Sequence, residues 1–441
     1  PQQGRPRPWR SRRTSAGRST RCRTTGHQPG PLDQTKLGQG CARQNSLFGS
    51  AEASSLRRAT ALRWPSGPSG AHSPEGRGCT VLPTIANRHR YPQLIPARHH
   101  AAAPDPRLRI AVLAPISWRT PPRHYGPWEQ FASLLADGLV AAGHDVTLFA
   151  TADSLTTANL HATASGGWSD DPTIEPKVAE CIHIASAFER AADFDIIHNG
   201  FDFLPLTYSG LVDTPVITTI HGFSSQQIVP VYERYDATTH YVAISNADRH
   251  PRLHYAATIH HGITTADFDV APVPGDHLLY FGRIHPDKGT AHAITVARRT
   301  GRRLDIAGII QDENYFRTEV APHLGNDIRY LGPVTATERS AVLGGAHALL
   351  HLIDFDEPFG YSVVEAMACG TPVIANGRGS MPELIDDGTT GFLVDTTEGA
   401  VDAVGDADRL DRIAIRATAV ERFDVSRMIE RYVAVYSDIL E

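Results

Sequence analysis

Two glutamates eight positions apart, Glu357 and Glu365, mark the part of this sequence with the most possible chemistry in a short span. The chain breaks at Gly360, and apolar residues at helical spacing then predict a helix over 361–369. Glu357 therefore lies just before this helix and Glu365 on its second turn. Carboxylates at these two places can accept hydrogen bonds from hydroxyl groups at either end of a ligand.

The start of the same predicted helix is a candidate anion site. The first N–H groups of a helix have no partner within it and point beyond its N-terminus. Here those groups belong to the segment Phe359, Gly360 and Tyr361. A carboxylate on each side of an anion-binding helix start suits a ligand with hydroxyls at both ends and phosphate in the middle, and a nucleotide-sugar fits that description.

A basic loop earlier in the chain could hold the same phosphates. Gly282, Arg283 and Lys288 follow a predicted strand over 277–281 and precede a predicted helix over 289–300. Arg can chelate two phosphate oxygens, and Lys supplies a point charge. The alternative interpretation is two solvated charges on a surface loop, the usual situation of Arg and Lys.

Together these motifs resemble those of the group 1, or family 4, retaining glycosyltransferases, which have the GT-B fold. The glutamate pair with its intervening loop resembles the E-x7-E motif of that family, and the basic loop over 282–289 resembles its G-R-x4-K-G segment. The resemblance implies that Glu357 binds hydroxyls of the donor sugar and that Glu365 holds the nucleotide ribose. It also implies that both cations of the basic loop hold the donor phosphates.

Two features of the first half resemble the same family. Gly126 lies in a loop where family members often have Gly-Gly, leading into a helix that faces the donor; Pro127 replaces the second glycine and removes one N–H. His221 ends a predicted strand over 216–220, and the family carries a His here that reaches the donor sugar. The alternatives are a plain helix cap at Gly126 and a structural role for His221, since most of the 22 histidines are not functional.

For three further residues we favour a structural role over a functional one. His198 and Asp202 follow another strand end and could line the acceptor side, but a lone His or Asp there is more often structural. The family usually has Asn where this chain has His261, and this departure is expected to affect a turn rather than chemistry.

The predicted fold class is α/β, with two Rossmann-like, doubly wound parallel-sheet domains that face each other across a cleft (GT-B). Strands that alternate with helices point to parallel sheets covered on both faces. The expected domains are an acceptor-side domain over 108–270, a nucleotide-sugar donor domain over 271–424, and a helix over 425–441 that crosses back to the first domain. Such sheets bind ligands outside the carboxyl ends of their strands.

The individual elements follow from short apolar runs and from helical spacing. The predicted strands are 109–114, 145–150, 195–198, 216–220, 241–244, 277–281, 303–307, 328–331, 348–352, 372–375 and 391–394. Besides the two helices beside the motifs, helices are predicted over 127–142 and 425–440. The segment from about 155 to 193 matches no motif.

Charge divides the chain into two unlike parts. Residues 1–107 hold 18 Lys and Arg against 4 Asp and Glu, whereas the rest holds 24 against 44. The leader is rich in Arg, Pro, Ser and Gly without periodicity, so it is expected to be disordered. We expect it to be upstream sequence read through, with translation starting near Leu108; the alternative is a basic tether for anionic lipid or nucleic acid. The acidic remainder argues against nucleic acid as a partner.

Cysteine usage and hydropathy give the expected location. Five cysteines without zinc-ligand spacing fit a reducing cytosol, and no apolar run is long enough to span a bilayer. The protein is therefore expected in the cytoplasm, with peripheral contact at the inner face of the membrane left open. No cofactor and no metal site are expected, since no Asp-x-Asp pair lies in a loop suited to a metal and a nucleoside diphosphate sugar serves as co-substrate.

The resemblance implies a retaining, metal-independent transfer of a hexose, glucose or mannose by family frequency, to an acceptor hydroxyl. The acceptor, a glycan, a lipid-linked sugar or a small metabolite, stays open, as does the choice between a front-face path and double displacement. The competing hypotheses are a GT-B nucleotide-sugar epimerase or phosphorylase and a non-catalytic protein that only binds a nucleotide-sugar.

Overall fold

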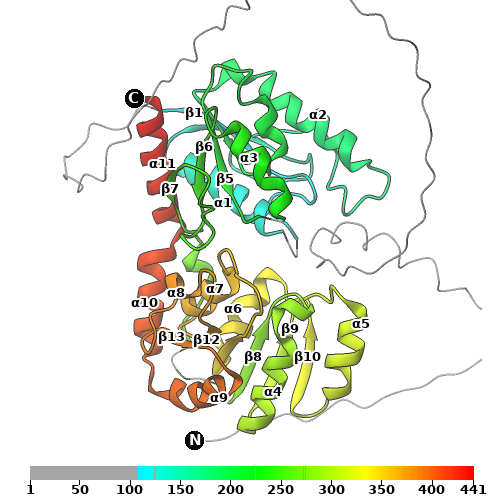
Figure 1. Cartoon of the computed structure of the whole chain (residues 1–441), viewed down its shortest axis with the longest axis vertical. Coiled ribbons are helices and arrows are strands. Elements are labelled where there is room, and N and C mark those ends of the chain that lie inside the picture. The colour runs from blue at the N-terminus through cyan, green and yellow to red at the C-terminus, as the bar shows by residue number, and fades with distance from the viewer. Residues whose placement is uncertain (1–106, 124–125, 224, 272, 274) are drawn as a thin grey trace, which may run out of the picture. The chain divides into compact units, whose positions relative to one another are not determined.

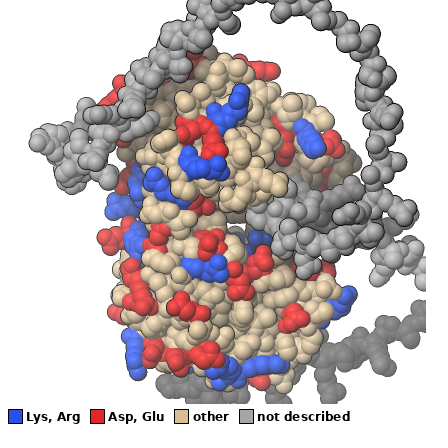
Figure 2. Space-filling view, viewed as in Figure 1, with Lys and Arg blue, Asp and Glu red and all other residues tan. Residues whose placement is uncertain are grey.

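The computed structural model describes residues 107–123, 126–223, 225–271, 273 and 275–441. The expectations for the leader, namely its disorder, its read-through origin and its role as a basic tether, fall outside these residues. Among the helices that the structure describes, none combines the length and the apolar character that crossing a lipid bilayer requires. Acidic and basic side chains are interspersed over the face of the molecule that Figure 2 shows.

The first sheet has seven strands, all parallel, in the order β3-β2-β1-β4-β5-β6-β7. Its central strands are apolar on both faces because helices cover both sides, as is typical of parallel sheets. The strands are β1 Arg109–Leu113, β2 Asp145–Phe149, β3 Asn159–His161, β4 Ile196–Asn199, β5 Val216–Ile220, β6 His240–Ala243 and β7 Tyr255–Thr258. The helices are α1 Pro127–Ala141, α2 Pro176–Phe188 and α3 Val229–Tyr235.

The second sheet has six strands, also all parallel, in the order β10-β9-β8-β11-β12-β13. Its strands are β8 His277–Phe281, β9 Arg303–Ala307, β10 Ile328–Gly332, β11 Ala348–His351, β12 Val373–Asn376 and β13 Gly391–Val394. The helices that follow β7 in the chain are α4 Thr290–Thr300, α5 Glu313–Tyr315, α6 Ala336–Gly344, α7 Tyr361–Ala368, α8 Met381–Leu384, α9 Thr397–Asp406, α10 Arg412–Phe423 and α11 Val425–Leu440. The predicted α/β class with two parallel sheets is confirmed.

Each sheet has one place where the strand order reverses, between β1 and β4 in the first and between β8 and β11 in the second. Two loops that leave such neighbouring strands diverge to opposite faces of the sheet and leave a crevice at the carboxyl edge, where ligands of α/β proteins bind. The sequence could place loops after strands, but only the strand order shows which loops meet.

The predicted elements agree with the structure to within one residue, but strands β3 and β7 and seven helices were missed. The missed helices are α2, α3, α5, α6, α8, α9 and α10. Helix α2 has only a weak apolar stripe, with Val178 and Ile182 exposed on its outer side. Strands β3 and β7 lie at the two edges of the first sheet and have no fully buried residue. An edge strand that is half exposed lacks the apolar run from which strands were predicted.

The last helix, α11, packs beside α1 and joins the core under the first sheet (Figure 1). Its buried face carries Met428, Ile429, Tyr432 and Tyr436. The Tyr432 hydroxyl lies 2.9 Å from Thr219 Oγ1, and the Tyr436 hydroxyl lies 2.7 Å from His198 Nδ1. Both contacts are made with strands of the first sheet, so the C-terminus contributes to the folding of the part of the chain that comes first.

Truncating Tyr432 should therefore destabilise the protein strongly. Tyr432→Ala removes a fully buried ring that contacts Phe131 and His198, and large-to-small changes of this kind cost about 3–5 kcal/mol. The free energy of unfolding, measured by urea denaturation, should fall by that amount. Asp438→Ala, on the exposed face of the same helix, is the control and should change it by less than about 0.5 kcal/mol. Equal effects of the two substitutions would contradict the packing of α11.

Candidate active site

Lys288 and Glu357 form a buried ion pair at the point where the order of the second sheet reverses. Lys288 ends the short 3₁₀ turn Pro286–Lys288 that follows β8, and Glu357 lies in the loop between β11 and α7. The distance from Lys288 Nζ to Glu357 Oε2 is 2.5 Å, and the two side chains are only 14% and 15% exposed. The geometry thus joins the basic loop and the first glutamate, which sequence reasoning treated as separate groups.

The electrostatics keep Glu357 charged. Burial alone would raise the pKa of Glu357, but Lys288, with smaller contributions from His351 and Arg283, outweighs burial and holds this pKa below its usual value. His351 lies 3.8 Å from the same carboxylate, and burial lowers the pKa of His351 to about 4. Glu357 is therefore ionised and its histidine neighbour neutral near pH 7, so the site holds a buried carboxylate anion.

A glycine makes this arrangement possible. Gly289 follows Lys288 with a positive φ of 73°, and a Cβ there would collide with the carbonyl oxygen of Leu352. Any other residue would push the loop away from the end of β11 and separate Lys288 from its partner. In the same loop the Arg283 side chain donates a hydrogen bond to Gln311, and its carbonyl oxygen accepts one from the Tyr280 hydroxyl at 2.6 Å.

The start of α7 lies beside Glu357. Gly360 has a φ of 110° and immediately precedes the helix, and a Cβ on it would lie 3.8 Å from Glu357 Cγ. Phe359 is buried, and its ring contacts those of Tyr361 and His261. The helix start and the ion pair therefore share one corner of the second sheet.

Glu365 is held by a different cation, which the sequence did not indicate. Arg339 on α6 donates a hydrogen bond of 2.7 Å to Glu365 Oε1, and the Glu365 side chain is 6% exposed. Burial raises the pKa of Glu365, and Arg339 offsets this only in part. Neither α6 nor its position facing α7 follows from a local motif, so Arg339 could be found only from the fold.

His221, the residue expected at the donor sugar, belongs to a column of four stacked rings. The ring centroids of Trp128 and His221 are 5.6 Å apart, those of His221 and His261 are 5.1 Å apart, and those of His261 and Tyr361 are 5.1 Å apart. His221 Nδ1 lies 3.3 Å from His261 Nε2. His261 is only 3% exposed, so the expectation that it affects merely a turn is wrong: its imidazole is packed between two aromatic neighbours.

Both histidines of the column are neutral. Burial lowers the pKa of His221 to about 3 and that of His261 well below 6.5, and a charge on His221 would lower the pKa of His261 further. One of the two facing nitrogens must then carry the shared proton while the other accepts it. The contact therefore fixes the orientation of His221 and couples its tautomer to that of His261.

The loops on which these residues lie approach one another closely. Gly222, next to His221, has a φ of 108°, and a Cβ on it would come within 2.9 Å of Pro358 Cγ. Gly126, the other predicted residue of the first sheet, precedes α1 with a φ of 155°, and a Cβ there would meet Glu129 Oε2 at 2.7 Å. Through Trp128 on α1, the loop of Gly126 supports the ring column.

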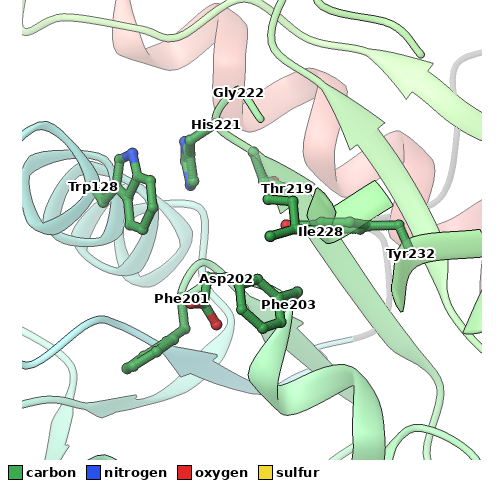
Figure 3. A pocket seen from close by; sticks show the side chains of 9 residues that line it. All are labelled: Trp128, Phe201, Asp202, Phe203, Thr219, His221, Gly222, Ile228 and Tyr232. Atoms are coloured by element: carbon green, nitrogen blue, oxygen red, sulfur yellow. The ribbon is translucent and has the colours of Figure 1, made fainter. Parts of the chain in front are cut away.

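The first sheet also carries a pocket at its carboxyl edge (Figure 3). It is lined by Trp128, Phe201, Asp202, Phe203, Thr219, His221, Gly222, Ile228 and Tyr232. Asp202, which sequence reasoning held to be structural more often than not, lies on this pocket. His198 does not: it is fully buried against Thr219 and Tyr436, and burial lowers its pKa to about 3.

Two sequence models of known families match the chain in succession. Residues 129–265 match the family described as Glycosyltransferase Family 4, and residues 270–409 match the family described as Glycosyl transferases group 1. Together these spans make up more than half of the chain. The protein belongs to the group 1, family 4 glycosyltransferases.

Relatives of this glycosyltransferase act in several biosynthetic settings. A phosphatidyl-myo-inositol mannosyltransferase of Mycolicibacterium smegmatis is 25% identical over 373 residues, which are 75% of this chain and 94% of that protein. A glycogen synthase of Mycobacterium tuberculosis is 26% identical over 339 residues, which are 63% of this chain and 80% of that protein. The crystal structure of AviGT4, a glycosyltransferase involved in avilamycin A biosynthesis, superposes on this protein with a TM-score of 0.57 at 25% sequence identity. The superposition covers 76% of this chain and 98% of AviGT4. The fold is thus that of the GT-B glycosyltransferases, and the enzyme uses a nucleotide-sugar.

Replacing Lys288 should destabilise the protein, because Glu357 is then buried without a cation beside it. In Lys288→Met the carboxylate is buried without its cation, and breaking such a pair costs about 3–5 kcal/mol near neutral pH. With Lys288 gone, burial raises the folded-state pKa of Glu357 above its unfolded value, so the loss should shrink as pH falls toward about 5. In the folded wild type the pKa of Glu357 is depressed, so the stability that the ion pair contributes is present at neutral pH and is lost as pH falls through that pKa.

Urea denaturation near pH 7 and near pH 5 measures both effects. The matched control is Lys177→Met on the exposed side of α2, which should have little effect at either pH. The double variant Lys288→Met/Glu357→Gln should recover most of the loss near pH 7. A loss that is the same at both pH values would show that the buried carboxylate is not its cause.

Proposed function

We propose that this enzyme is a retaining, metal-independent hexosyltransferase that moves glucose or mannose from a nucleoside diphosphate to an acceptor hydroxyl. Residues 108–270 would provide the acceptor side, residues 271–424 the donor side, and the helix over 425–441 the connection back to the first sheet. The buried pair of Lys288 and Glu357 is the observation that carries the proposal, because a cation and an anion side by side suit a ligand in which a phosphate is joined to a sugar.

The positive groups of this corner suit a diphosphate leaving group. Negative charge grows on the phosphate as the bond to the anomeric carbon breaks. Arg283, Lys288 and the N–H groups at the start of α7, from Phe359 to Tyr361, are fixed before the reaction and stabilise this charge more in the transition state than in the bound donor. Two cations and a helix start supply the positive charge that a divalent metal supplies in other enzymes.

The two glutamates bind the two ends of the donor. Glu357, kept ionised by Lys288, accepts hydrogen bonds from hydroxyls of the donor sugar and fixes its ring. Glu365, oriented by Arg339, accepts hydrogen bonds from the nucleotide ribose. Gly126 and Gly282 let the backbone approach the donor. Because each carboxylate already has a cation beside it, neither adds an uncompensated charge to the diphosphate site.

His221 acts on the donor sugar as a neutral imidazole. A neutral ring in this position can exchange hydrogen bonds with sugar hydroxyls without repelling the nearby cations. Either a front-face path, in which the departing phosphate takes the acceptor proton, or a double displacement satisfies these roles. Glucose and mannose are proposed because the relatives include a glycogen synthase and a mannosyltransferase.

A donor screen tests the function. The full chain would be mixed separately with UDP-glucose, UDP-galactose, UDP-N-acetylglucosamine, GDP-mannose and ADP-glucose in EDTA, and thermal shift and release of nucleoside diphosphate would be followed. One glucosyl or mannosyl donor should stabilise the protein and be cleaved. Lys288→Ala and Glu357→Gln should each lower the cleavage rate by about a hundredfold or more, as loss of transition-state charge stabilisation does.

The matched controls are Lys177→Ala and Glu421→Gln, both exposed, which should cleave the donor at the wild-type rate. Binding without cleavage of any donor would favour a binding protein, and conversion of the sugar while it stays attached to the nucleotide would favour an epimerase. Cleavage that EDTA abolishes and Mg²⁺ restores would rule out metal independence.

A crossed pair of substitutions tests whether His261 positions His221. His261→Phe keeps a stacked ring but removes the nitrogen that faces His221, whereas His261→Asn keeps a polar group and removes the ring. If the hydrogen bond positions His221, the His261→Phe variant should have a kcat about tenfold lower than the wild type, which corresponds to the loss of one hydrogen bond. The His261→Asn variant should keep most of the wild-type kcat. The donor KM should change little in either variant. The opposite order, with Phe active and Asn inactive, would leave His261 a packing residue only.

A further inference from the structure

The pocket on the first sheet lies where that sheet reverses its strand order. Asp202 and its neighbours follow β4, His221 and Gly222 follow β5, Trp128 comes from α1, and Tyr232 from α3. Figure 3 shows Trp128 and His221 on one side of the pocket, Thr219, Ile228 and Tyr232 opposite, and the segment from Phe201 to Phe203 below. Since His221 borders this pocket and also belongs to the ring column that reaches α7, a molecule in the pocket lies next to the proposed donor sugar.

The lining is aromatic and apolar with few polar groups. Five of the nine lining residues are Trp, Phe, Tyr or Ile, and the polar ones are Asp202, Thr219 and His221. Such walls suit the C–H faces of a ring-shaped ligand, and the polar groups suit its hydroxyls. None of these nine residues is Lys or Arg.

The titratable groups around the pocket are acids and a neutral imidazole. Burial raises the pKa of Asp202 to about 7, the Leu204 N–H that donates to it at 2.7 Å partly offsets this, and Glu180 raises it further. Burial also raises the pKa of Asp248 to about 8, and the charges of Asp202 and Asp248 both act on Tyr232. His221 is uncharged near pH 7. A phosphate placed here would meet no cation of the lining and at least one acidic group.

We propose that this pocket receives the reacting end of the acceptor and selects an uncharged, hydroxyl-bearing group of a sugar or polyol without phosphate. Its volume of about 30 Å³ admits a hydroxyl or hydroxymethyl group, while the rest of the acceptor lies outside against the aromatic rim. Asp202 accepts a hydrogen bond from the acceptor hydroxyl. A buried phosphate without a cation is strongly disfavoured, whereas a neutral hydroxyl is satisfied by Asp202 in either protonation state. This assignment rests on the proposed glycosyl transfer and adds the class of acceptor to it.

Matched pairs of acceptors test the selection. Glucose, mannose and myo-inositol would be compared with glucose 6-phosphate, mannose 6-phosphate and myo-inositol 1-phosphate by ligand-observed NMR on the full chain. At least one neutral compound should bind, and its phosphorylated twin should bind about tenfold more weakly or worse, a gap of about 1.4 kcal/mol. Binding of a phosphorylated twin as tight as that of its neutral partner, or binding by none of the neutral compounds, would overturn the proposal.

Two substitutions with opposite expected effects locate the selection in the pocket. Asp202→Ala removes the accepting oxygen and should weaken binding of the neutral ligand about tenfold, while the thermal shift that the donor causes in this variant should match that of the wild type. The exposed Asp213→Ala is the control. Ile228→Lys adds a cation to a partly exposed wall and should improve binding of the phosphorylated twin. If neither substitution alters the preference, the pocket is not the acceptor site.

Donor cleavage is read separately from acceptor binding. If the wild type cleaves a donor but prefers phosphorylated acceptors, only the acceptor class is wrong. If neutral compounds bind with the expected selectivity but no donor is cleaved, the proposed transfer itself fails. The two failures are therefore distinguishable in the same set of experiments.

Discussion

The contact between Lys288 and Glu357 is the interaction on which the second sheet's site depends. The two residues are 69 positions apart, yet β8 and β11 are neighbours and deliver one charge each to the same corner. Neither charge can stay buried without the other, because an unpaired ion in a mostly dry site is far more costly than the pair. The ion pair thus ties two loops together, and Gly289 allows the close approach that this needs.

Neutrality has a similar organising effect in the ring column. His221 Nδ1 lies 3.3 Å from His261 Nε2, and burial keeps both rings uncharged near pH 7. Two charged rings at this distance would repel each other. Trp128 and Tyr361 stack on the two ends of this pair, so the orientation of both imidazoles comes from packing, and the hydrogen bond between them couples their tautomers.

Local patterns in the sequence were enough to predict most strands of the fold and about half of the residues of this site. Strands β5 and β8 were predicted to the residue because they are short apolar runs beside turn residues, and the two glutamates stood out through spacing around a helix start. Contacts between distant segments could not be predicted: the Lys288–Glu357 pair depends on strand order, and Arg339 depends on how α6 faces α7. For His261 the pattern suggested a turn, whereas three-dimensional packing makes it a buried ring.

The crevices of the two sheets differ in charge. The crevice of the second sheet combines Lys288, Arg283 and a helix start, which suit a diphosphate, and the crevice of the first sheet combines aromatic walls with Asp202, which suit hydroxyls. The close approach of Gly222 to Pro358 brings the loops of these crevices together. A ligand carrying phosphate is therefore stabilised on one side of the contact and disfavoured on the other. In the proposed assignment this difference in charge separates the donor from the acceptor, because the side chains at the strand ends of each sheet suit only one of the two ligands.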